Sequence, residues 1–329
     1  MPIHYLLLLL LSIYSWRLSA QELAQKQFQL MGCWFEVKVF AQEEEQAQAA
    51  LAAGIAEMQR IEELISSWQP NSATSQINAQ AGQQAVRVPL ELLTLIQRAK
   101  KISALTDGAF DISFAPKNSP WQFKGQTLEK WPEMPPKASS ANWQSIQVDE
   151  LAQTVYLPDP QMQIGFGGLG KGYAADKAKA LMQKMPGVTA GLVNASGDLN
   201  CWGQPPGKTG WNIQILSPNK QAPPLGYLQL NGQALVSSGD YEKFFYYQGE
   251  RYAHIIDPKT GRPTQGIQSA SVLCPSAELA DALATALFVL GPDKGLALID
   301  QLDQIEAFIW LSDNSYRCSK NIEIKRDDQ

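Results

Sequence analysis

The chain has 329 residues, enough for one large domain or for two lobes that share a core. Apolar residues make up 45% of the sequence and charged residues 18%, a balance typical of globular proteins and not of disordered ones. The net charge is −5. Because an acidic protein gains no affinity from counterion release on nucleic acid, we expect no nucleic-acid partner.

The first twenty residues resemble an export signal. A leucine-rich run from Tyr5 to Ile13 precedes Leu18-Ser19-Ala20, which offers a small residue for cleavage before Gln21. We therefore expect residues 1–20 to be a signal peptide and the mature protein to be periplasmic. An uncleaved N-terminus on the inner membrane is the alternative. Residues 21–329 contain no run that we expect to span a membrane, since a span needs about 20 apolar residues.

The first elements expected in the mature chain are a strand and a helix. Phe35–Phe40 alternates like a half-buried strand, and Glu43–Leu64 has apolar residues at helical spacing. Ser66–Gln83 is polar and rich in turn formers, which predicts a surface loop. Pro89–Leu105 is a second predicted helix, with Pro89 suited to its first turn.

The rest of the chain mixes short strands with helices, without a strict strand–helix alternation. Helices are predicted at Tyr173–Met185 and Ser276–Leu290, the second closed by Gly291-Pro292. Loops are predicted at residues 131–136, 204–210 and 217–226. Short strands are predicted at 145–148, 155–157, 191–193, 211–216, 227–230 and 306–310. This pattern favours an α+β fold, with mixed or antiparallel sheets flanked by helices, in a single domain from residue 21 to residue 329.

Four cysteines stand far apart in the sequence: Cys33, Cys201, Cys274 and Cys318. They form no CxxC pair, so a zinc site has no support. An oxidising compartment permits disulfides, but the sequence does not pair them. None of the four follows the leucine-rich run, so no lipid-anchoring cysteine is expected.

A glycine-rich segment, residues 163–173, carries the densest signal. Gly165, Gly167 and Gly170 satisfy the dinucleotide pattern GxGxxG, but the acidic residue expected about 20 positions later is missing. The same segment lacks the Ser or Thr that must follow Lys171 in a Walker A motif. What remains is a set of unhindered backbone amides, a helix N-terminus and a lysine, which suit a pyrophosphate. A tight turn that needs glycine only for its shape is the alternative.

Three further segments have both a structural and a functional interpretation. Thr106–Ile112 is typical of a helix C-terminus that turns into a strand, and Asn194–Asp198 follows an apolar strand like a plain turn. Pro258–Pro263 has hairpin chemistry. His254 is the only histidine outside the export segment, so any histidine chemistry in the mature protein depends on it.

Asp281 and Thr285 lie four residues apart in the predicted helix Ser276–Leu290 and therefore share one face. Most of their neighbours are Ala, Leu, Phe or Val, so the carboxylate needs water, a cap or a cation. A carboxylate and a hydroxyl one turn apart suit a hard ion such as magnesium. An exposed aspartate in the first turn, favoured by the helix dipole, is the alternative.

Taken in order, these segments resemble the ApbE family of FAD:protein FMN transferases from Met31 to about Ile299. The resemblance rests on Met31-Gly32, Ser67-Trp68, Ser75-Gln76-Ile77-Asn78, Thr106–Asp111, Gly167-Gly168-x-x-Lys171-Gly172-Tyr173-Ala174-x-Asp176, Asn194–Asp198, Ser238-Gly239-Asp240-Tyr241, His254-x-Ile256-Asp257-Pro258-x-Thr260-Gly261-x-Pro263 and Ala280–Ala286.

The resemblance implies an enzyme that splits FAD, its substrate, and attaches FMN to a threonine of an acceptor redox protein, releasing AMP. It places the FAD pyrophosphate across the glycine segment. The residues implied in binding FAD are Met31, Trp68, Ala109, Phe110, Asp111, Gly165, Lys171, His254 and Ile255. The implied Mg²⁺ ligands are Asp281, Thr285 and the backbone carbonyl of Gly168. His254 is the implied base for the threonine hydroxyl, with Asp281 as its competitor.

The sequence departs from the family pattern at three places. Cys33 stands where the family usually has Thr, Gly165 where it usually has Asp, and Ser196 where it usually has Gly. The change at Gly165 removes a side chain that could contact the nucleotide.

Other classes of protein also remain open at this stage. A magnesium-dependent FAD pyrophosphatase needs the same phosphate and metal site as a transferase. A non-catalytic flavin-binding protein needs no metal on the pyrophosphate, and neither does an exported solute-binding protein. A nicotinamide dehydrogenase is disfavoured by the missing acidic residue.

Overall fold

The computed structural model of the chain describes residues 21–115, 120–132, 141–218, 223–240 and 243–326. Its largest element is an eight-stranded sheet with the order β1-β2-β7-β8-β11-β15-β16-β17, in which all neighbours are antiparallel. Its strands are β1 (Glu22–Leu30), β2 (Cys33–Ala41), β7 (Val188–Ala195), β8 (Asp198–Trp202), β11 (Ala234–Gly239), β15 (Ile267–Cys274), β16 (Glu306–Leu311) and β17 (Tyr316–Cys318).

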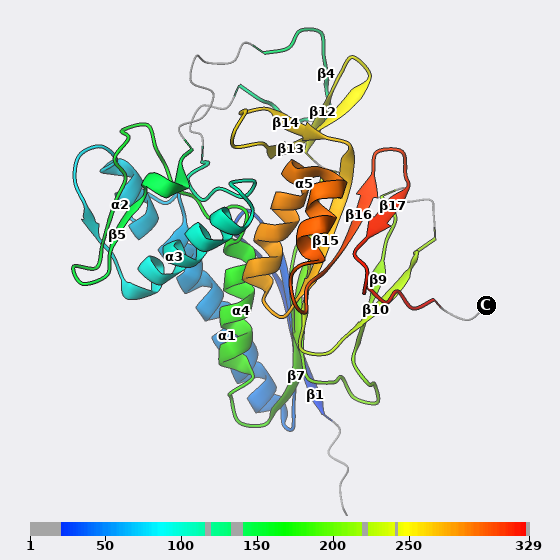
Figure 1. Cartoon of the computed structure of the whole chain (residues 1–329). Helices are drawn as coiled ribbons and strands as arrows, with labels where there is room; N and C mark the ends of the chain where they lie inside the picture. Colours follow the sequence, from blue (N-terminus) through cyan, green and yellow to red (C-terminus); the bar gives the residue numbers. More distant parts are fainter. Residues whose placement is uncertain (1–20, 116–119, 133–140, 219–222, 241–242, 327–329) are drawn as a thin grey trace, which may run out of the picture.

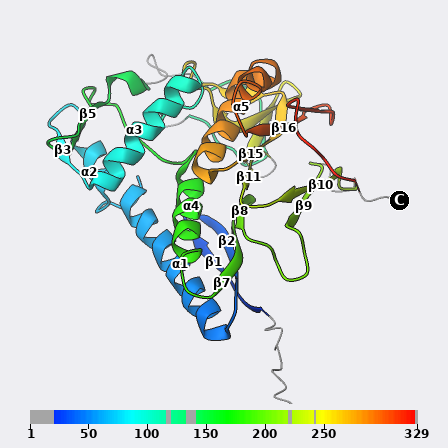
Figure 2. The same cartoon turned by 60° about the horizontal axis from the view of Figure 1, so that its bottom comes forward.

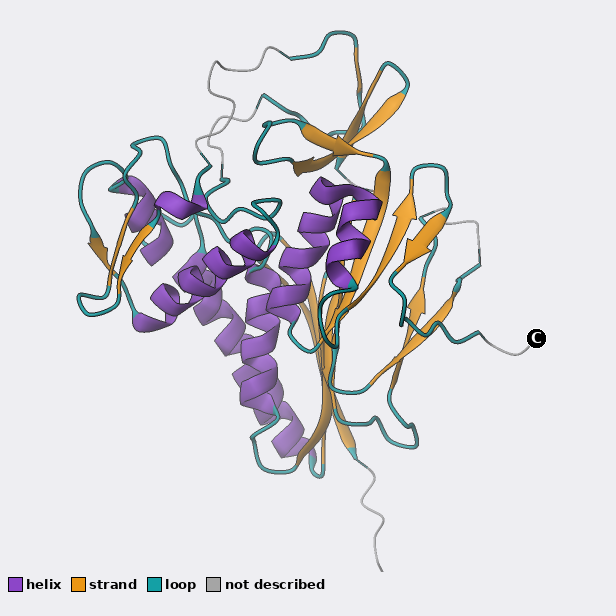
Figure 3. Ribbon diagram, in the orientation of Figure 1, coloured by secondary structure: helices purple, strands orange, loops and turns teal. Residues whose placement is uncertain are grey.

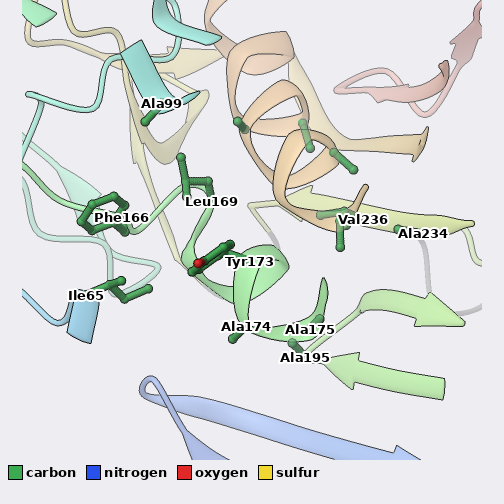
Figure 4. Close-up of a cluster of buried hydrophobic side chains, with 14 of the residues drawn as sticks. Ile65, Ala99, Phe166, Leu169, Tyr173, Ala174, Ala175, Ala195, Ala234 and Val236 are labelled. Atoms are coloured by element: carbon green, nitrogen blue, oxygen red, sulfur yellow. The ribbon is translucent and has the colours of Figure 1, made fainter. Parts of the chain in front are cut away.

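Helices cover one face of this sheet. Figures 1 and 2 show α1 (Glu44–Ile65), α4 (Gly170–Met182) and α5 (Ala277–Ile299) packed on it. The alternation in β2 buries Phe35, Val37 and Val39 on this face. Figure 4 shows part of the core they join, with small residues of α4 close to the sheet. The labelled members of that cluster are Ile65, Ala99, Phe166, Leu169, Tyr173, Ala174, Ala175, Ala195, Ala234 and Val236.

A second, smaller core lies on the opposite face of the sheet. The ribbon of β9 (Trp211–Ile215) and β10 (Gly226–Leu230) packs there and buries Ile215, Leu228 and Leu230. The sheet therefore separates helices on one side from strands on the other (Figure 3). Because both faces of this sheet bury apolar side chains, the residues of β7 are all buried or half-buried.

Two small sheets complete the fold. One has the order β14-β13-β12-β4 and contains β4 (Thr127–Leu128), β12 (Phe244–Tyr247), β13 (Glu250–Ile256) and β14 (Pro263–Gln265). The other, β3-β6-β5, contains β3 (Val86–Arg87), β5 (Gln147–Asp149) and β6 (Thr154–Tyr156), and lies near α2 (Ala73–Ala79), α3 (Leu90–Leu105) and the short helix η1 (Trp143–Ser145). The parallel pair β4–β12 makes the first of these sheets mixed.

The α+β fold class expected from the sequence is confirmed, and most predicted elements are present within one or two residues. The helix predicted from Tyr173 begins earlier, at Gly170, and ends earlier, at Met182. The hairpin turn at Pro258–Pro263 joins β13 to β14 as expected. The predicted signal peptide lies outside the described residues, as do parts of two predicted loops, at 133–136 and 219–222.

Three expectations were wrong. Ser66–Gln83 is not only loop, because α2 forms within it with Ser72 as its N-cap, accepting a hydrogen bond from the Ser75 amide at 2.9 Å. The turn after α3 does not lead into a strand, since residues 111–115 have no strand structure. Gly291 does end the first part of α5, with φ of 75°, but helix resumes from Pro292 to Ile299.

The expectation that no segment after residue 20 is long and apolar enough to span a membrane was also wrong. Among the described residues, α5 is long and apolar enough, with a mean hydropathy of 1.5 over its best window. However, it is kinked at Gly291, contacts α4, β11 and β15, and buries Asp281. These contacts are those of the core helix of a folded domain.

At Gly172 the backbone of α4 comes into close contact with the backbone of α5. A Cβ atom placed there would lie 2.1 Å from the Ala277 carbonyl oxygen, a backbone atom that cannot rotate away. We predict that Gly172→Ala lowers the free energy of unfolding by about 1–3 kcal/mol, measured by urea titration, because the helices must move apart. Gly167→Ala is the matched control, since a Cβ there meets nothing within 4 Å. Equal stability of the two variants would contradict this account.

Candidate functional site

A cavity of about 750 Å³ opens where the glycine segment, α5 and the β13–β14 hairpin meet. Its volume lies within the roughly 300–1,000 Å³ of small-molecule and cofactor sites. Segments far apart in the sequence supply its walls. The lining residues are Ser67, Trp68, Pro70, Ser75, Asn78, Ala79, Ala109, Phe110, Asp111, Phe114, Ala115, Gln163, Gly165, Gly167, Gly168, His254, Ile255, Ile256, Pro258 and Thr285.

The glycine segment is held in place by its apolar side chains and by its backbone. Phe166 and Leu169 are buried in the core, as Figure 4 shows, while Gly165, Gly167 and Gly168 face the cavity. The turn then closes on itself, because the Gly170 amide donates to the Phe166 carbonyl at 2.6 Å. The segment thus presents backbone to the cavity and side chains to the core.

Asn78 of α2 fixes the start of this segment. Its Nδ2 donates to the Ile164 carbonyl at 2.9 Å, and its Oδ1 accepts from the Ile164 amide at 2.8 Å. Gly165 in turn donates from its amide to the Ile112 carbonyl at 3.0 Å. A Cβ at Gly165 would lie 3.0 Å from the Cβ of Ala115. A side chain there would have to displace Ala115, which gives a steric reason for the departure from the family pattern.

The glycine segment does not belong to a dinucleotide-binding βαβ unit. β6 before it and β7 after α4 lie in different sheets, and β7 pairs only with antiparallel neighbours. The GxGxxG fingerprint requires two parallel strands of one sheet joined by the helix. The structure therefore rules out that interpretation of the motif and removes the main support for a nicotinamide dehydrogenase.

Thr285 of α5 lies against the glycine segment. A Cβ added to Gly168 would be 3.2 Å from Thr285 Oγ1 and 3.3 Å from the Phe110 ring. The Thr285 hydroxyl, the Gly168 backbone and Phe110 are therefore neighbours on the cavity wall. Asp281 lies one helical turn before Thr285 and is only 2% exposed, so the alternative of a solvent-exposed first-turn aspartate was wrong.

Behind this wall, Lys171 is shared between two buried carboxylates. Its Nζ lies 2.7 Å from Asp198 Oδ2 and 3.1 Å from both carboxylate oxygens of Asp281. The Gly172 amide also donates to Asp281 Oδ2 at 3.3 Å. Functional roles were predicted for Lys171 and Asp281 from the sequence, whereas Asp198 was interpreted only as part of a turn. Asp198 begins β8, and only the pairing of that strand brings it to Lys171.

The cluster carries an unbalanced negative charge. Burial raises the pKa of Asp198, although Lys171 opposes the effect. Burial would lower the pKa of Lys171, but the carboxylates of Asp281 and Asp198 outweigh it and raise that pKa. Two carboxylates and one ammonium leave one charge to be balanced, either by a shared proton or by a cation. With the hydroxyl of Thr285 and the carbonyl of Gly168 adjacent, these are the oxygen ligands that suit Mg²⁺.

His254 of β13 is neutral at pH 7. Burial, with the positive charges of Lys243 and Lys171, lowers its pKa to about 4. Its ring meets Phe123 edge-on at 6.3 Å, and its Nδ1 has no hydrogen-bond partner among the described residues. A neutral imidazole in a cavity wall has a free lone pair to accept a proton, and the low pKa makes it a weaker base than an ordinary histidine.

The structure brings most of the predicted site residues together. Nine of them line the cavity: Trp68, Ala109, Phe110, Asp111, Gly165, Gly168, His254, Ile255 and Thr285. Lys171 and Asp281 form the layer behind it, and Met31 lies outside the lining. The Met31 amide donates to Glu62 Oε1 at 2.6 Å. The contacts these residues make with a ligand stay predictions.

Cys33 lies near the charged cluster rather than near another cysteine. All four cysteines are free. Burial raises the pKa of the Cys33 thiol, and the charges of Lys171, Asp198 and Asp281 all act on it. A neutral thiol is close in size to the threonine hydroxyl expected there, so the departure at Cys33 leaves the charge of the cluster unchanged.

Comparison with known proteins agrees with the resemblance seen in the sequence. The model of the ApbE family matches residues 31–309. A FAD:protein FMN transferase of Klebsiella pneumoniae (strain 342) is 31% identical over 283 residues, which cover 84% of this chain and 86% of that protein. One of Treponema pallidum (strain Nichols) is 30% identical over 295 residues, covering 84% and 81%. The chain belongs to the ApbE family.

Solved structures show the same fold. The ApbE protein of Thermotoga maritima superposes with a TM-score of 0.79 at 27% identity, covering 91% of this chain and 97% of that one. The apo form of the flavinyl transferase ApbE of Pseudomonas stutzeri gives a TM-score of 0.78 at 25% identity, covering 91% and 95%.

The low pKa of His254 predicts how stability depends on pH. Between pH 6.5 and about 4 the unfolded chain takes up a proton at this position and the folded chain does not. The free energy of unfolding therefore falls as the pH falls, by about 2–3 kcal/mol between pH 7 and 4.5 from this group alone. His254→Gln should lack that part of the decline in urea titrations. Parallel curves for wild type and variant would contradict the prediction.

Proposed function

We propose that this chain is an FAD:protein FMN transferase, which splits FAD and attaches the FMN half to a threonine hydroxyl of an acceptor protein. One observation carries the proposal. A single cavity joins the exposed backbone of the glycine segment, the Phe110 ring and the neutral His254 to Thr285, with buried Asp281 one turn away. Two relatives named FAD:protein FMN transferase match most of the chain and support it.

The reaction replaces the phosphoanhydride bond of FAD with a phosphoester bond to the threonine. The threonine oxygen attacks the phosphorus of the FMN half, the bond from that phosphorus to the bridging oxygen breaks, and AMP leaves with that oxygen. His254 takes the hydroxyl proton. Its Nδ1 is buried, so Nε2 is the nitrogen left to accept it. Asp281 is the competing base, but its carboxylate already accepts from Lys171 and Gly172.

Each wall of the cavity has a separate task. The amides around Gly167 and Gly168 face the phosphates, as backbone free of Cβ atoms does in other phosphate sites. Phe110 and Ile255 supply apolar surface for the flavin ring, and Trp68, at 92% exposure, stands at the mouth. Trp68 is free to close over a ligand or to meet the acceptor protein.

Asp281, Thr285 and the Gly168 carbonyl are the residues that would hold Mg²⁺. They fit the ion because their donors are oxygens and because Asp198 and Asp281 share a single ammonium group, that of Lys171. Magnesium bound there would neutralise charge on the phosphates. Lys171 stays between the carboxylates of Asp198 and Asp281.

The proposal extends to location and acceptor. The leucine-rich segment of residues 1–20 supports export to the periplasm, with inner-membrane attachment through an uncleaved N-terminus as the alternative. The acceptor is then an exported or membrane-bound redox subunit that presents a threonine. The described part of the chain leaves the mouth of the cavity open at Trp68 for such a partner.

The transferase should label an acceptor domain with fluorescent flavin when incubated with FAD and magnesium, as seen on a denaturing gel. EDTA should abolish the label. Asp281→Asn, which keeps the side-chain size, should lower the rate at least about 100-fold, because several kcal/mol of charge stabilisation depend on the metal. Asp293→Asn is the matched control, since Asp293 lies exposed on the same helix and pairs with Arg317.

The same experiment separates the competing functions. Free FMN and AMP without labelled acceptor would indicate a pyrophosphatase that hands FMN to water. FAD recovered intact from the protein would indicate a non-catalytic flavin-binding protein. Either result would overturn the proposal of a transferase.

His254→Ala should lower the transfer rate by about 100- to 10,000-fold at pH 7, the usual contribution of a general base. The variant should still bind FAD, measured by quenching of flavin fluorescence, because the glycine segment and Phe110 are untouched. Full activity of His254→Ala would show that the base is another group, and Asp281 would be the next candidate.

A further inference from the structure

The carboxylate of Asp176, on α4, is fully used in holding the beginning of α5. Its Oδ1 accepts from the Ala277 amide at 3.0 Å and from Asn200 Nδ2 at 2.6 Å. Its Oδ2 accepts from the Glu278 amide at 3.0 Å and from Ser276 Oγ at 2.8 Å. Each oxygen therefore receives two hydrogen bonds from groups that only donate to it.

These bonds satisfy the first amides of α5, which have no partner inside the helix. Ser276 is the N-cap and accepts from the Leu279 amide at 3.3 Å, so the Ala277 and Glu278 amides would be unpartnered without Asp176. The carboxylate also lies at the positive end of the helix dipole. An aspartate from one helix thus caps another helix, and the two cannot shift relative to each other without breaking these bonds.

The same two helices carry the charged part of the site. Lys171, five residues before Asp176 on α4, pairs with Asp281, four residues after Ala277 on α5. Between these two links lies Gly172, where the backbones are so close that no Cβ fits. The α4–α5 contact therefore has three successive points, and Asp176 is the one farthest from the cavity.

We infer that Asp176 is a positioning residue: it sets the place of α5, and with it the Asp281 carboxylate and the Thr285 hydroxyl, against Lys171 and the glycine segment. A carboxylate fits best here, because four groups donate to it. An amide of the same size would direct its NH₂ group at one of the backbone amides of α5, which would lose its acceptor, and only the Ser276 hydroxyl could turn to accept instead. The inference deepens the proposed function, on which its magnesium part rests, but the position of α5 is open to measurement without it.

The test compares Asp176→Asn with Asp300→Asn. Asp300 lies at the other end of α5, where it accepts from the Lys320 amide at 3.1 Å, so it controls for loss of a carboxylate that contacts α5 away from its N-terminus. In the FAD-free protein, Asp176→Asn should speed hydrogen exchange of the amides in the first two turns of α5. Asp300→Asn should leave those amides unchanged.

The second measurement is Mn²⁺ binding to the FAD complex, followed by electron paramagnetic resonance. Asp176→Asn should weaken Mn²⁺ by about 10- to 100-fold, the usual effect of removing a group that orients metal ligands. Its affinity for FAD should change less than about twofold, since no cavity-lining residue is altered. Saturating Mg²⁺ should restore most of the transfer rate.

The outcomes are distinguishable. A variant that melts earlier but binds Mn²⁺ like the wild type and exchanges normally in α5 would reduce Asp176 to a stabilising cap and overturn the inference. If the wild-type complex takes up no Mn²⁺, the proposed metal site is wrong, and the exchange result alone decides whether Asp176 positions α5. Should Asp176→Asn fail to fold, Asn200→Ala removes one of the four bonds without touching the N-cap of α5, and it should shift both readouts in the same direction by less.

Discussion

The site depends on the approach of two helix backbones at Gly172. Because α4 meets α5 with no side chain between them, the residue before that contact, Lys171, reaches both Asp281 and Asp198. Larger separation would leave two buried carboxylates without their ammonium, and a buried charge without a partner costs several kcal/mol. The close packing of α4 on α5 at Gly172 is therefore also what keeps Lys171 within reach of the two carboxylates. The glycine is needed for the ion pairs more than for the shape of the helix.

The sheet with its helices and the segments that line the cavity have different roles in the site. The eight-stranded sheet and its helices carry the charged residues, with Asp198 on β8, Lys171 on α4 and Asp281 on α5. The residues that face the cavity come mostly from turns, from α2 and from a small sheet. A ligand would therefore lie between a fixed charged layer and walls that differ more readily among relatives.

Local patterns were enough to predict the elements that bury one face over several turns. α1 and α3 repeat apolar residues at helical spacing, and β2 alternates without interruption, so their type and limits were clear. The first part of α5 was equally clear, but its continuation beyond Gly291 was not. α2 has only seven residues and depends on the Ser72 cap, which makes it resemble a loop. β1 is mostly polar and belongs to the sheet only because β2 pairs with it along nine residues. Pairing between strands is long-range information that no window of sequence contains.

The site shows the same limit. His254, Asp281, Thr285 and the glycine segment stood out because their residue types are unusual for their surroundings. Asp198 did not stand out, because an aspartate that follows a glycine is typical of turns. Its role appears only when β7 and β8 pair and set it beside Lys171. The family pattern alone made Gly165 the loss of a nucleotide contact, whereas the structure shows that a side chain there would press on Ala115, with the two Cβ atoms 3.0 Å apart.

The cavity walls come from segments as distant as Ser67 and Thr285, and this has a consequence for the protein outside its reaction. None of these walls exists until the whole chain is folded, so a molecule that occupies the cavity binds the native state alone. Occupancy then adds about 2.7 kcal/mol to stability when the ligand is present at 100 times its dissociation constant. The lifetime of this protein against proteolysis would therefore follow the supply of its ligand.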